Sequence, residues 1–159
     1  MSRAGTAQGR ARSRRKGGTM EGFPFSCPVE VRYGDVDAMD HVNNAVYVTF
    51  LEQARMRMWQ ARIGRLGSAR AIPIIVARVA VDYRSPVGLY ESVEIGVGVR
   101  EIGRTSFTLA YRIEADGRLA AEGVSVQVLY DYGGGHPVPI EGELREKLEA
   151  LRLAPAERS

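Results

Sequence analysis

The sequence predicts an α+β domain in which one long helix packs against a five-stranded antiparallel sheet. One segment places apolar residues at helical spacing, and five others either alternate apolar and polar residues or are rich in β-branched ones. The last four of these segments follow one another with short turns between them. Short turns join antiparallel neighbours, whereas parallel strands need long crossovers. A helix and a sheet that pack their apolar faces together form a two-layer domain.

The first strand is expected over residues 28–33, where apolar and charged side chains alternate. A loop over residues 34–42 follows it. The long helix is expected to begin at Asn43 or Asn44, because a side-chain oxygen there can accept an otherwise unpaired N–H of the first turn. It is expected to run to about Arg65.

The long helix is expected to be largely enclosed, because its apolar surface extends well beyond one face. Four residues at helical spacing form the main face: Tyr47, Leu51, Ala54 and Met58. Three more widen the apolar surface: Val48, Phe50 and Trp59. Gly64 and Gly67 are expected to end the helix.

Four strands are expected after the helix. They span Ile74–Tyr83, Val93–Val99, Phe107–Ile113 and Val124–Tyr130. Asp116 and Gly117 form a dipeptide typical of tight hairpins and are expected to join the last two strands. A glycine loop at 133–135 precedes a short polar helix over 141–151, which is expected to lie at the periphery.

The chain of 159 residues is long enough for one domain with its own core. Residues 1–19 hold six of the 22 lysines and arginines and no acid, so the remainder carries 16 basic against 19 acidic residues. We expect a disordered basic tail over 1–21, because it has too little apolar surface to offset the entropy of ordering. A single domain is expected over 22–155. Met20 is an alternative start of the native chain.

Composition excludes several classes of protein. The single cysteine, Cys27, excludes an internal disulfide framework, and no apolar run approaches the roughly 18 residues of a membrane helix. No leader opens the chain, so a cytoplasmic protein without a membrane partner is expected. A basic arm can bind nucleic acid, but no interleaved basic and aromatic residues follow it. Nucleic acid is therefore not the expected partner.

The unusual segment is Asp35–Asn44, which holds three carboxylates and a histidine within seven residues. It leads into the long helix, whose N-terminal N–H groups and positive dipole suit a developing oxyanion. A carboxylate nearby could act as a nucleophile or a general base. The competing interpretation is a plain connector, with Asp35 and Asp37 as turn residues and an asparagine as the helix cap. Spacing alone leaves both interpretations open.

Other familiar site motifs are absent from the sequence. It contains no G-x-S-x-G, H-E-x-x-H, P-loop or C-x-x-C. The two histidines, His41 and His136, lie far apart in the chain. Neither a metal nor a cofactor is therefore expected.

The unusual segment and its surroundings resemble the hotdog-fold thioesterases of the 4-hydroxybenzoyl-CoA thioesterase and acyl-CoA thioesterase group. Three runs carry the resemblance: Arg32–Asp37, His41–Tyr47 and Phe50–Arg55. It covers about residues 25–131, and its most specific part is the run D-x-D-x-x-x-H-V-N-N-x-x-Y. The resemblance implies a helix wrapped by a curved sheet of strand order 1-3-4-5-2. It also implies dimers with a continuous ten-stranded sheet, and often tetramers.

The resemblance implies a set of catalytic residues. Asp37 matches the family's catalytic carboxylate, which serves as nucleophile or as base for water. The backbone N–H that holds the thioester oxygen falls at Asn44, with Ala45 next. His41 and Asn43 would shape the loop around them.

Two further positions bear on this machinery. Plant acyl-carrier-protein thioesterases, which also resemble this segment, place an asparagine between the aspartate and a histidine, and Met39 stands there instead. Glu52 is a second candidate carboxylate, because a sister lineage of hotdog thioesterases uses one on the helix. An ion pair of Glu52 with Arg55 or Arg32 is the expected role.

The resemblance also implies contacts with substrate. Arg104, Thr105 and Ser106 fall where relatives contact the phosphates of coenzyme A, and arginine forks suit phosphate. Arg84 is a further candidate for the phosphates and Tyr47 for the acyl tunnel. Simple exposure of the arginines and core packing of the tyrosine are the competing interpretations.

The function that follows is that of an acyl-CoA thioesterase, in which water cleaves a thioester to a carboxylic acid and free coenzyme A. Its expected partners are the acyl-CoA substrate and further copies of the chain, as a homodimer or homotetramer. The alternative from a different class is a non-catalytic acyl-CoA-binding protein of the same fold. A hotdog dehydratase is disfavoured, because the H-x-x-x-x-P-G type of helix entry is missing.

Overall fold

The computed structural model describes residues 20–64 and 73–154. Five long strands form one antiparallel sheet in the order β1-β3-β4-β5-β2. The strands are β1 (Phe25–Val29), β2 (Ile74–Tyr83), β3 (Val93–Ile102), β4 (Ser106–Ala115) and β5 (Arg118–Asp131). A two-residue strand, β6 (His136–Pro137), pairs with the end of β5.

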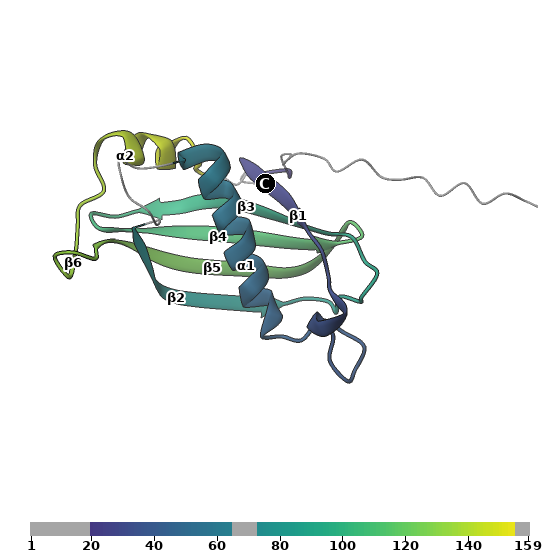
Figure 1. Cartoon of the computed structure of the whole chain (residues 1–159). Coiled ribbons are helices and arrows are strands. Elements are labelled where there is room, and N and C mark those ends of the chain that lie inside the picture. Colours follow the sequence, from purple (N-terminus) through teal and green to yellow (C-terminus); the bar gives the residue numbers. More distant parts are fainter. Residues whose placement is uncertain (1–19, 65–72, 155–159) are drawn as a thin grey trace, which may run out of the picture.

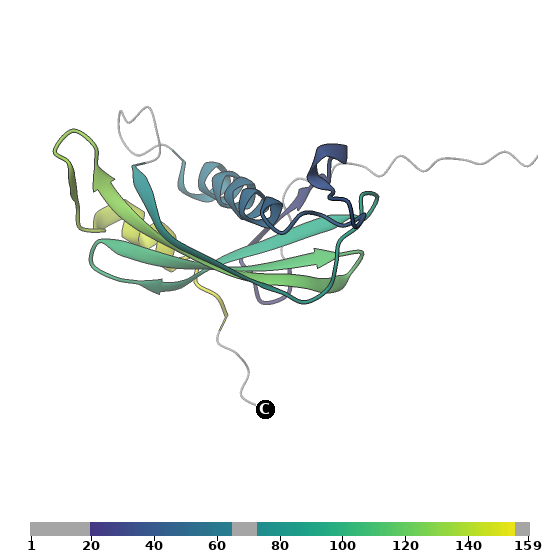
Figure 2. The same ribbon diagram turned by 90° about the horizontal axis from the view of Figure 1, so that it is seen from below.

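The long helix α1 (Val46–Met58) lies across the concave face of this sheet (Figure 1). Figure 2 shows the strands curling around one side of the helix. A second helix, α2 (Gly142–Glu149), packs near the far end of α1. The α+β class, the hotdog architecture and the strand order implied by the resemblance are confirmed.

The first strand is shorter than predicted and lies earlier in the chain. It spans Phe25–Val29 instead of residues 28–33, because its last paired residue, Val29, is opposite Val93, where β3 begins. The chain then forms a 3₁₀ turn over Tyr33–Asp35. The prediction of a strand over residues 30–33 was therefore wrong.

Both ends of α1 depend on local hydrogen bonds. Asn43 Oδ1 accepts the N–H of Ala45, the residue that precedes the first helical turn, at 2.9 Å. An asparagine thus supports the helix start, as predicted, although it lies outside the helix itself. Beyond Met58 one π-helical turn continues to Ile63, and Gly64, with φ +74°, ends it. Gly67 lies outside the described residues.

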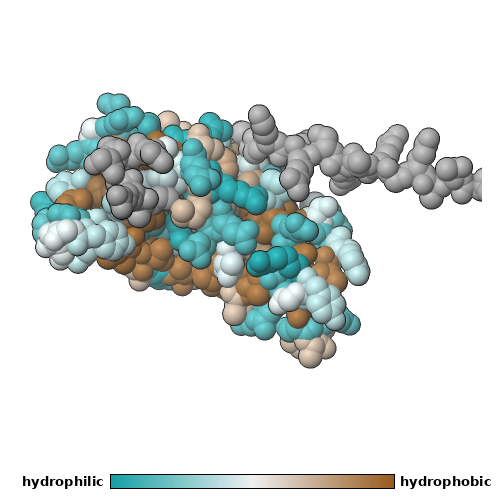
Figure 3. Space-filling model, viewed as in Figure 1, coloured by the Kyte–Doolittle hydropathy of each residue, from teal (hydrophilic) through white to brown (hydrophobic). Residues whose placement is uncertain are grey.

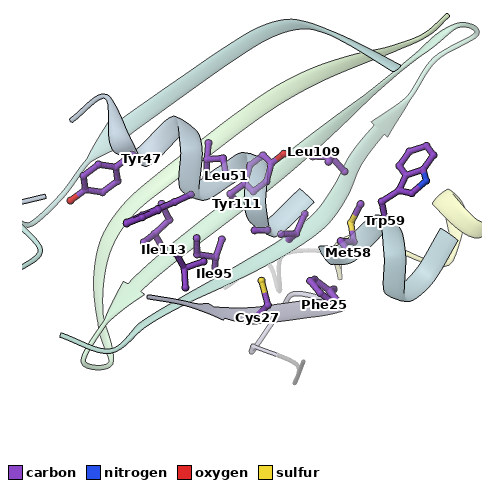
Figure 4. Packing of buried hydrophobic residues seen from close by; sticks show 14 of the residues in the cluster. Phe25, Cys27, Tyr47, Leu51, Met58, Trp59, Ile95, Leu109, Tyr111 and Ile113 are labelled. Atoms are coloured by element: carbon purple, nitrogen blue, oxygen red, sulfur yellow. The ribbon is translucent and has the colours of Figure 1, made fainter. Parts of the chain in front are cut away.

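The predicted main face of α1 is buried as a whole. Figure 4 shows side chains from β1, β3 and β4 gathered against it. Phe50 and Trp59 are buried too, so the apolar surface does extend around the helix. Val48 is the exception: its side chain is 44 % exposed, on the face turned to solvent.

Several other predictions are confirmed. β2 has the predicted bounds, and Asp116 and Gly117 form the β4–β5 turn with φ of +49° and +82°, as a tight hairpin requires. The polar helix is present as α2, but it is less peripheral than predicted, because Leu144 and Leu148 are buried. Within the described ranges, neither helix has the length and apolar character needed to cross a bilayer. The predicted tail lies outside those ranges up to residue 19.

The two edge strands of the sheet differ in whether their outer backbone groups are available for strand pairing. Along β1, Pro24 and Pro28 have no N–H to offer, and their carbonyl oxygens accept hydrogen bonds from Arg62 and Arg57. These features block further strand pairing. β2 is the last strand on the other side, and no strand in the described part of the chain pairs with its outer edge. Figure 3 shows apolar surface along this side of the molecule.

We expect Gly123→Ala to destabilise the protein. A Cβ at position 123 of β5 would lie 2.8 Å from Leu51 Cδ1 of α1, so either the Leu51 side chain or the spacing of helix and sheet would have to change. The expected loss in the free energy of unfolding is about 1–3 kcal/mol. Urea denaturation of the variant and wild type measures it.

Gly34→Ala is the matched control, because a Cβ there meets no atom within 4 Å. It should leave stability within about 0.5 kcal/mol of wild type. Equal stability of both variants would contradict the close helix–sheet approach.

Candidate active site

The segment between the first strand and the helix folds into a tight loop. Val36 and Val42 form a single antiparallel bridge at its base. Inside it, the N–H of Asp37 donates to the carbonyl of His41 at 2.9 Å, and the N–H of Asp40 donates back to the carbonyl of Asp37 at 3.1 Å. Asp40 has a φ of +60°, which aspartate tolerates better than most residues.

The loop fixes the carboxylate of Asp37. Its Oδ1 accepts the N–H of Met39 at 2.8 Å, and no group in the described part of the chain donates to its other oxygen. The Asp37 side chain is half-buried, whereas Met39 beside it is 72 % exposed. One carboxylate oxygen is therefore held in place while the other is available.

The helix entry offers one N–H group to a ligand. The N–H of Ala45 is taken by the Asn43 side chain, and the N–H of Val46 by the Asn43 carbonyl, both at 2.9 Å. Among residues 20–64 and 73–154, no group accepts a hydrogen bond from the N–H of Asn44. An unpaired N–H at the positive end of a helix is suited to a developing oxyanion.

Contacts from distant segments hold this entry in place. The N–H of Val42 donates to the carbonyl of Val87 at 2.8 Å, and the hydroxyl of Tyr83 donates to the carbonyl of Asn44 at 2.8 Å. The rings of Tyr83 and Tyr47 meet edge to face, with centroids 5.0 Å apart. Burial raises the pKa of the Tyr47 phenol. Tyr47, predicted to bind substrate, packs in the core at the helix start.

The three aspartates that lie close together in the sequence have different surroundings in the structure. Asp35 is buried, and its carboxylate accepts the N–H of Arg32 at 2.8 Å, which closes the 3₁₀ turn. Asp40 and His41 are exposed. Asp37 is the carboxylate that is neither committed to an ion pair nor fully exposed to solvent.

The residues predicted to bind coenzyme A fall in two places. Arg104, Thr105 and Ser106 form the β3–β4 hairpin, beside α2 and at the opposite end of the sheet from the Asp37 loop (Figure 1). Arg104 is exposed, and its carbonyl accepts the N–H of Ile140 at 2.7 Å. Within a single chain, this hairpin and Asp37 are therefore not close together.

Arg84 lies at the same end of the sheet as the helix entry. Its guanidinium forms an exposed ion pair with Glu122 at 2.9 Å. Glu52 is exposed and pairs with neither Arg55 nor Arg32 in the described part of the chain, so that prediction was wrong. Arg32 pairs with Asp35 instead.

Sequence reasoning missed the end of β2 and the segment that follows it. The carbonyl of Val87 and the hydroxyl of Tyr83 support the site from 39 or more residues away, and no local pattern indicates such contacts. This segment is itself held by Glu91, which accepts the N–H of Gly88 and pairs with Arg118. Within the described residues, no group of three or more histidine, cysteine or acidic side chains could hold a metal ion.

A long helix wrapped by a curved sheet and entered through a carboxylate-bearing loop is the arrangement of hotdog thioesterases. Residues 31–148 match the thioesterase-like superfamily. The chain belongs to this superfamily. The family and the enzyme class predicted from the sequence, a thioester hydrolase, are confirmed.

Characterised relatives agree with this assignment. The long-chain acyl-CoA thioesterase FadM of Escherichia coli strain K12 is 31% identical over 126 residues, which cover 77% of this chain and 96% of FadM. The acyl-CoA thioester hydrolase YbgC of Escherichia coli O6:H1 is 32% identical over 91 residues, 56% of this chain and 68% of YbgC. A thioesterase from Thermus thermophilus, crystallised with coenzyme A and zinc, superposes with a TM-score of 0.76 at 39% identity, covering 86% of this chain and 99% of that one.

We expect Glu91→Gln to destabilise the protein at neutral pH but much less in acid. The hydrogen bond from Arg118, aided by the N–H of Gly88, lowers the pKa of the Glu91 carboxyl below its ordinary value. A carboxyl whose pKa is lowered by folding stabilises the protein above its ordinary pKa. That contribution is lost as the pH falls through the lower, folded-state pKa.

Urea denaturation of wild type and variant at pH 7 and at about pH 3 measures this difference. The gap in the free energy of unfolding should shrink at the lower pH. Glu52→Gln, which removes an exposed carboxylate with no ion pair, should show no such change. A gap of equal size at both pH values would rule out the ionised Glu91 as the support of this segment.

Proposed function

We propose that this thioester hydrolase, an acyl-CoA thioesterase, cleaves its substrate with the carboxylate of Asp37 and stabilises the oxyanion with the N–H of Asn44. One observation carries the proposal: the loop that orients Asp37 leads directly into the helix start at which the Asn44 N–H is unpaired. A carboxylate and an oxyanion donor are the two groups that attack on a thioester requires.

Two routes use these groups with the same outcome. As a general base, Asp37 takes a proton from water while the water oxygen bonds to the thioester carbon. The carbon–sulfur bond then breaks and releases the coenzyme A thiolate, which takes up a proton. As a nucleophile, a carboxylate oxygen bonds to the carbon and expels the thiolate, and water then hydrolyses the resulting anhydride. In both routes the negative charge on the thioester oxygen develops next to the helix start.

We further propose that the working site is shared between two copies of the chain. β3 and β4 each span ten residues, about 33 Å of extended chain, and this length separates the Arg104 hairpin from the Asp37 loop. Antiparallel pairing of two β2 strands would place the hairpin end of one copy beside the loop end of the other. β2 is the edge available for this pairing, because arginines and prolines block β1.

We expect Asp37→Asn to lower kcat by roughly 100-fold or more, the scale on which acid–base groups contribute. Asparagine keeps an oxygen that can accept the N–H of Met39, so the loop should keep its shape. Release of free thiol from acyl-CoAs of short, medium, long and aromatic acyl groups measures the effect.

Asp40→Asn is the matched control, because Asp40 lies in the same loop but is exposed. It should retain near wild-type turnover. Near-normal turnover by Asp37→Asn would remove Asp37 from its assigned role. Failure of folded wild type to release thiol from any of these esters would favour the acyl-CoA-binding alternative.

We expect Arg104→Ala to raise KM for CoA esters more than it lowers kcat, as loss of uniform binding does. If the site is shared, this variant should complement Asp37→Asn. In a mixed dimer, one of the two sites receives the native Asp37 from one chain and the native Arg104 from the other. At substrate concentrations below KM, the mixed dimer should regain about half of wild-type activity.

Differently tagged chains, refolded together and purified through both tags, provide the mixed dimer. Each variant carried through the same refolding alone is the control. A mixed dimer no more active than the better parent would show that Asp37 and Arg104 do not act in one site across two chains.

A further inference from the structure

A buried cluster of polar side chains lies between α1 and the sheet. Tyr111 of β4 and Ser125 of β5 share a hydrogen bond of 2.7 Å between their hydroxyls, and the Gln127 amide donates to Ser125 Oγ at 2.6 Å. Arg55 of α1 completes the cluster. Burial raises the pKa of the Tyr111 phenol, and the hydrogen bond with Ser125 and the charge of Arg55 act against that rise.

Two members of this cluster have buried atoms without a partner. Among the described residues, Arg55 Nε and Gln127 Oε1 find no hydrogen-bond partner, although Arg55 is only 7 % exposed and Gln127 is fully buried. In the described part of the chain, Arg55 forms no ion pair. A buried positive charge without a carboxylate is costly. The cluster therefore buries a positive charge, with one unpaired donor, Arg55 Nε, and one unpaired acceptor, Gln127 Oε1.

The cluster lies against α1, beyond the proposed oxyanion site in the direction of the chain. Arg55 follows Asn44 by 11 residues, which at the helical rise per residue is about 16 Å along the helix axis. Ser125 and Gln127 lie opposite Val79 and Val76 of β2. Val76 is 39 % exposed, and apolar surface borders this side of the molecule (Figure 3).

We infer that the cluster of Arg55, Tyr111, Ser125 and Gln127 receives the far end of the acyl group and selects acyl groups that carry a carboxylate there. This inference rests on the proposed function, because it assumes that the acyl group extends from the Asn44 N–H along α1. It assigns the substrate class: mono-CoA esters of dicarboxylic acids are favoured over esters of unsubstituted fatty acids.

The chemistry of the cluster accounts for this choice. A guanidinium presents its N–H groups in a planar fork that fits the two oxygens of a carboxylate. A carboxylate would also neutralise the charge that α1 buries, while the apolar surface beside β2 accepts the methylene chain. An unsubstituted alkyl end would leave Arg55 Nε unpaired.

The test compares each mono-CoA ester of a dicarboxylic acid with the unsubstituted acyl-CoA of equal chain length. Chains of about six to about twelve carbons are used, because the span along the helix is about 16 Å. Wild type should show the higher kcat/KM for the carboxylated ester. Arg55→Met should lower the ratio of the two kcat/KM values by about 10-fold or more, the scale of a lost hydrogen bond to a charged group. Arg55→Lys should restore part of the ratio, because it restores the charge without the fork.

Arg57→Met is the matched control, because Arg57 is an exposed arginine of the same helix. It should leave the ratio of the two kcat/KM values unchanged.

A wild-type ratio of one or less would overturn the inference. An equal loss of activity on both ester types in Arg55→Met would also overturn it, because that is the result of a purely structural arginine. If Arg55→Met does not fold, Arg55→Gln, which keeps a polar side chain but removes the charge, makes the same comparison.

A binding measurement keeps this inference separate from the proposed catalysis. Free dicarboxylic acids should raise the melting temperature of full-length Asp37→Asn more than monocarboxylic acids of equal length do, because they bind the folded state. Adding Arg55→Met should abolish the difference. This result would stand even if wild type hydrolysed no ester. Equal shifts from both acids would overturn the inference while leaving the proposed reaction intact.

Discussion

Burial of α1 in the curl of the sheet is the constraint on which the rest of the structure depends. The helix is apolar over more than one face, so a flat sheet could not remove all of that surface from water. The two layers pack tightly at Gly123, where a Cβ would lie 2.8 Å from Leu51 Cδ1. Once the helix is seated, the position of its first turn is set. The chain leaving β1 must then reverse its direction before it enters that turn, and this reversal holds Asp37.

The fold could be predicted from the sequence because its elements have strong local patterns. β2, rich in β-branched residues, has the bounds the sequence predicts, and Asp116 and Gly117 predict the hairpin that they form. The extent of β1 could not be predicted in this way. Its last paired residue is decided by Val93, which is far away in the sequence and carries no local signal for that pairing. Where a strand stops is a property of its neighbour as much as of its own residues.

The site could be predicted in part, and the limit has a similar cause. The sequence shows which carboxylates are close in the chain but not how they are used, and only the structure separates the buried Asp35 from the half-buried Asp37. Helical spacing places Glu52 within reach of Arg55, yet Arg55 turns to the core and Glu52 to solvent. Side-chain direction depends on what the opposite layer offers, and periodicity within one element does not contain that information.

The unequal edges of the sheet also limit how large an assembly can grow. A sheet with two open edges can add chains at both ends without a stopping point, which is how fibres elongate. Here guanidinium groups and prolines occupy one edge, so strand pairing through β2 would use the open edge that the described part of each chain presents. Growth by edge pairing would end at two copies. Arg57 and Arg62, which donate to the carbonyls of Pro28 and Pro24, would in such a dimer prevent further growth through β1.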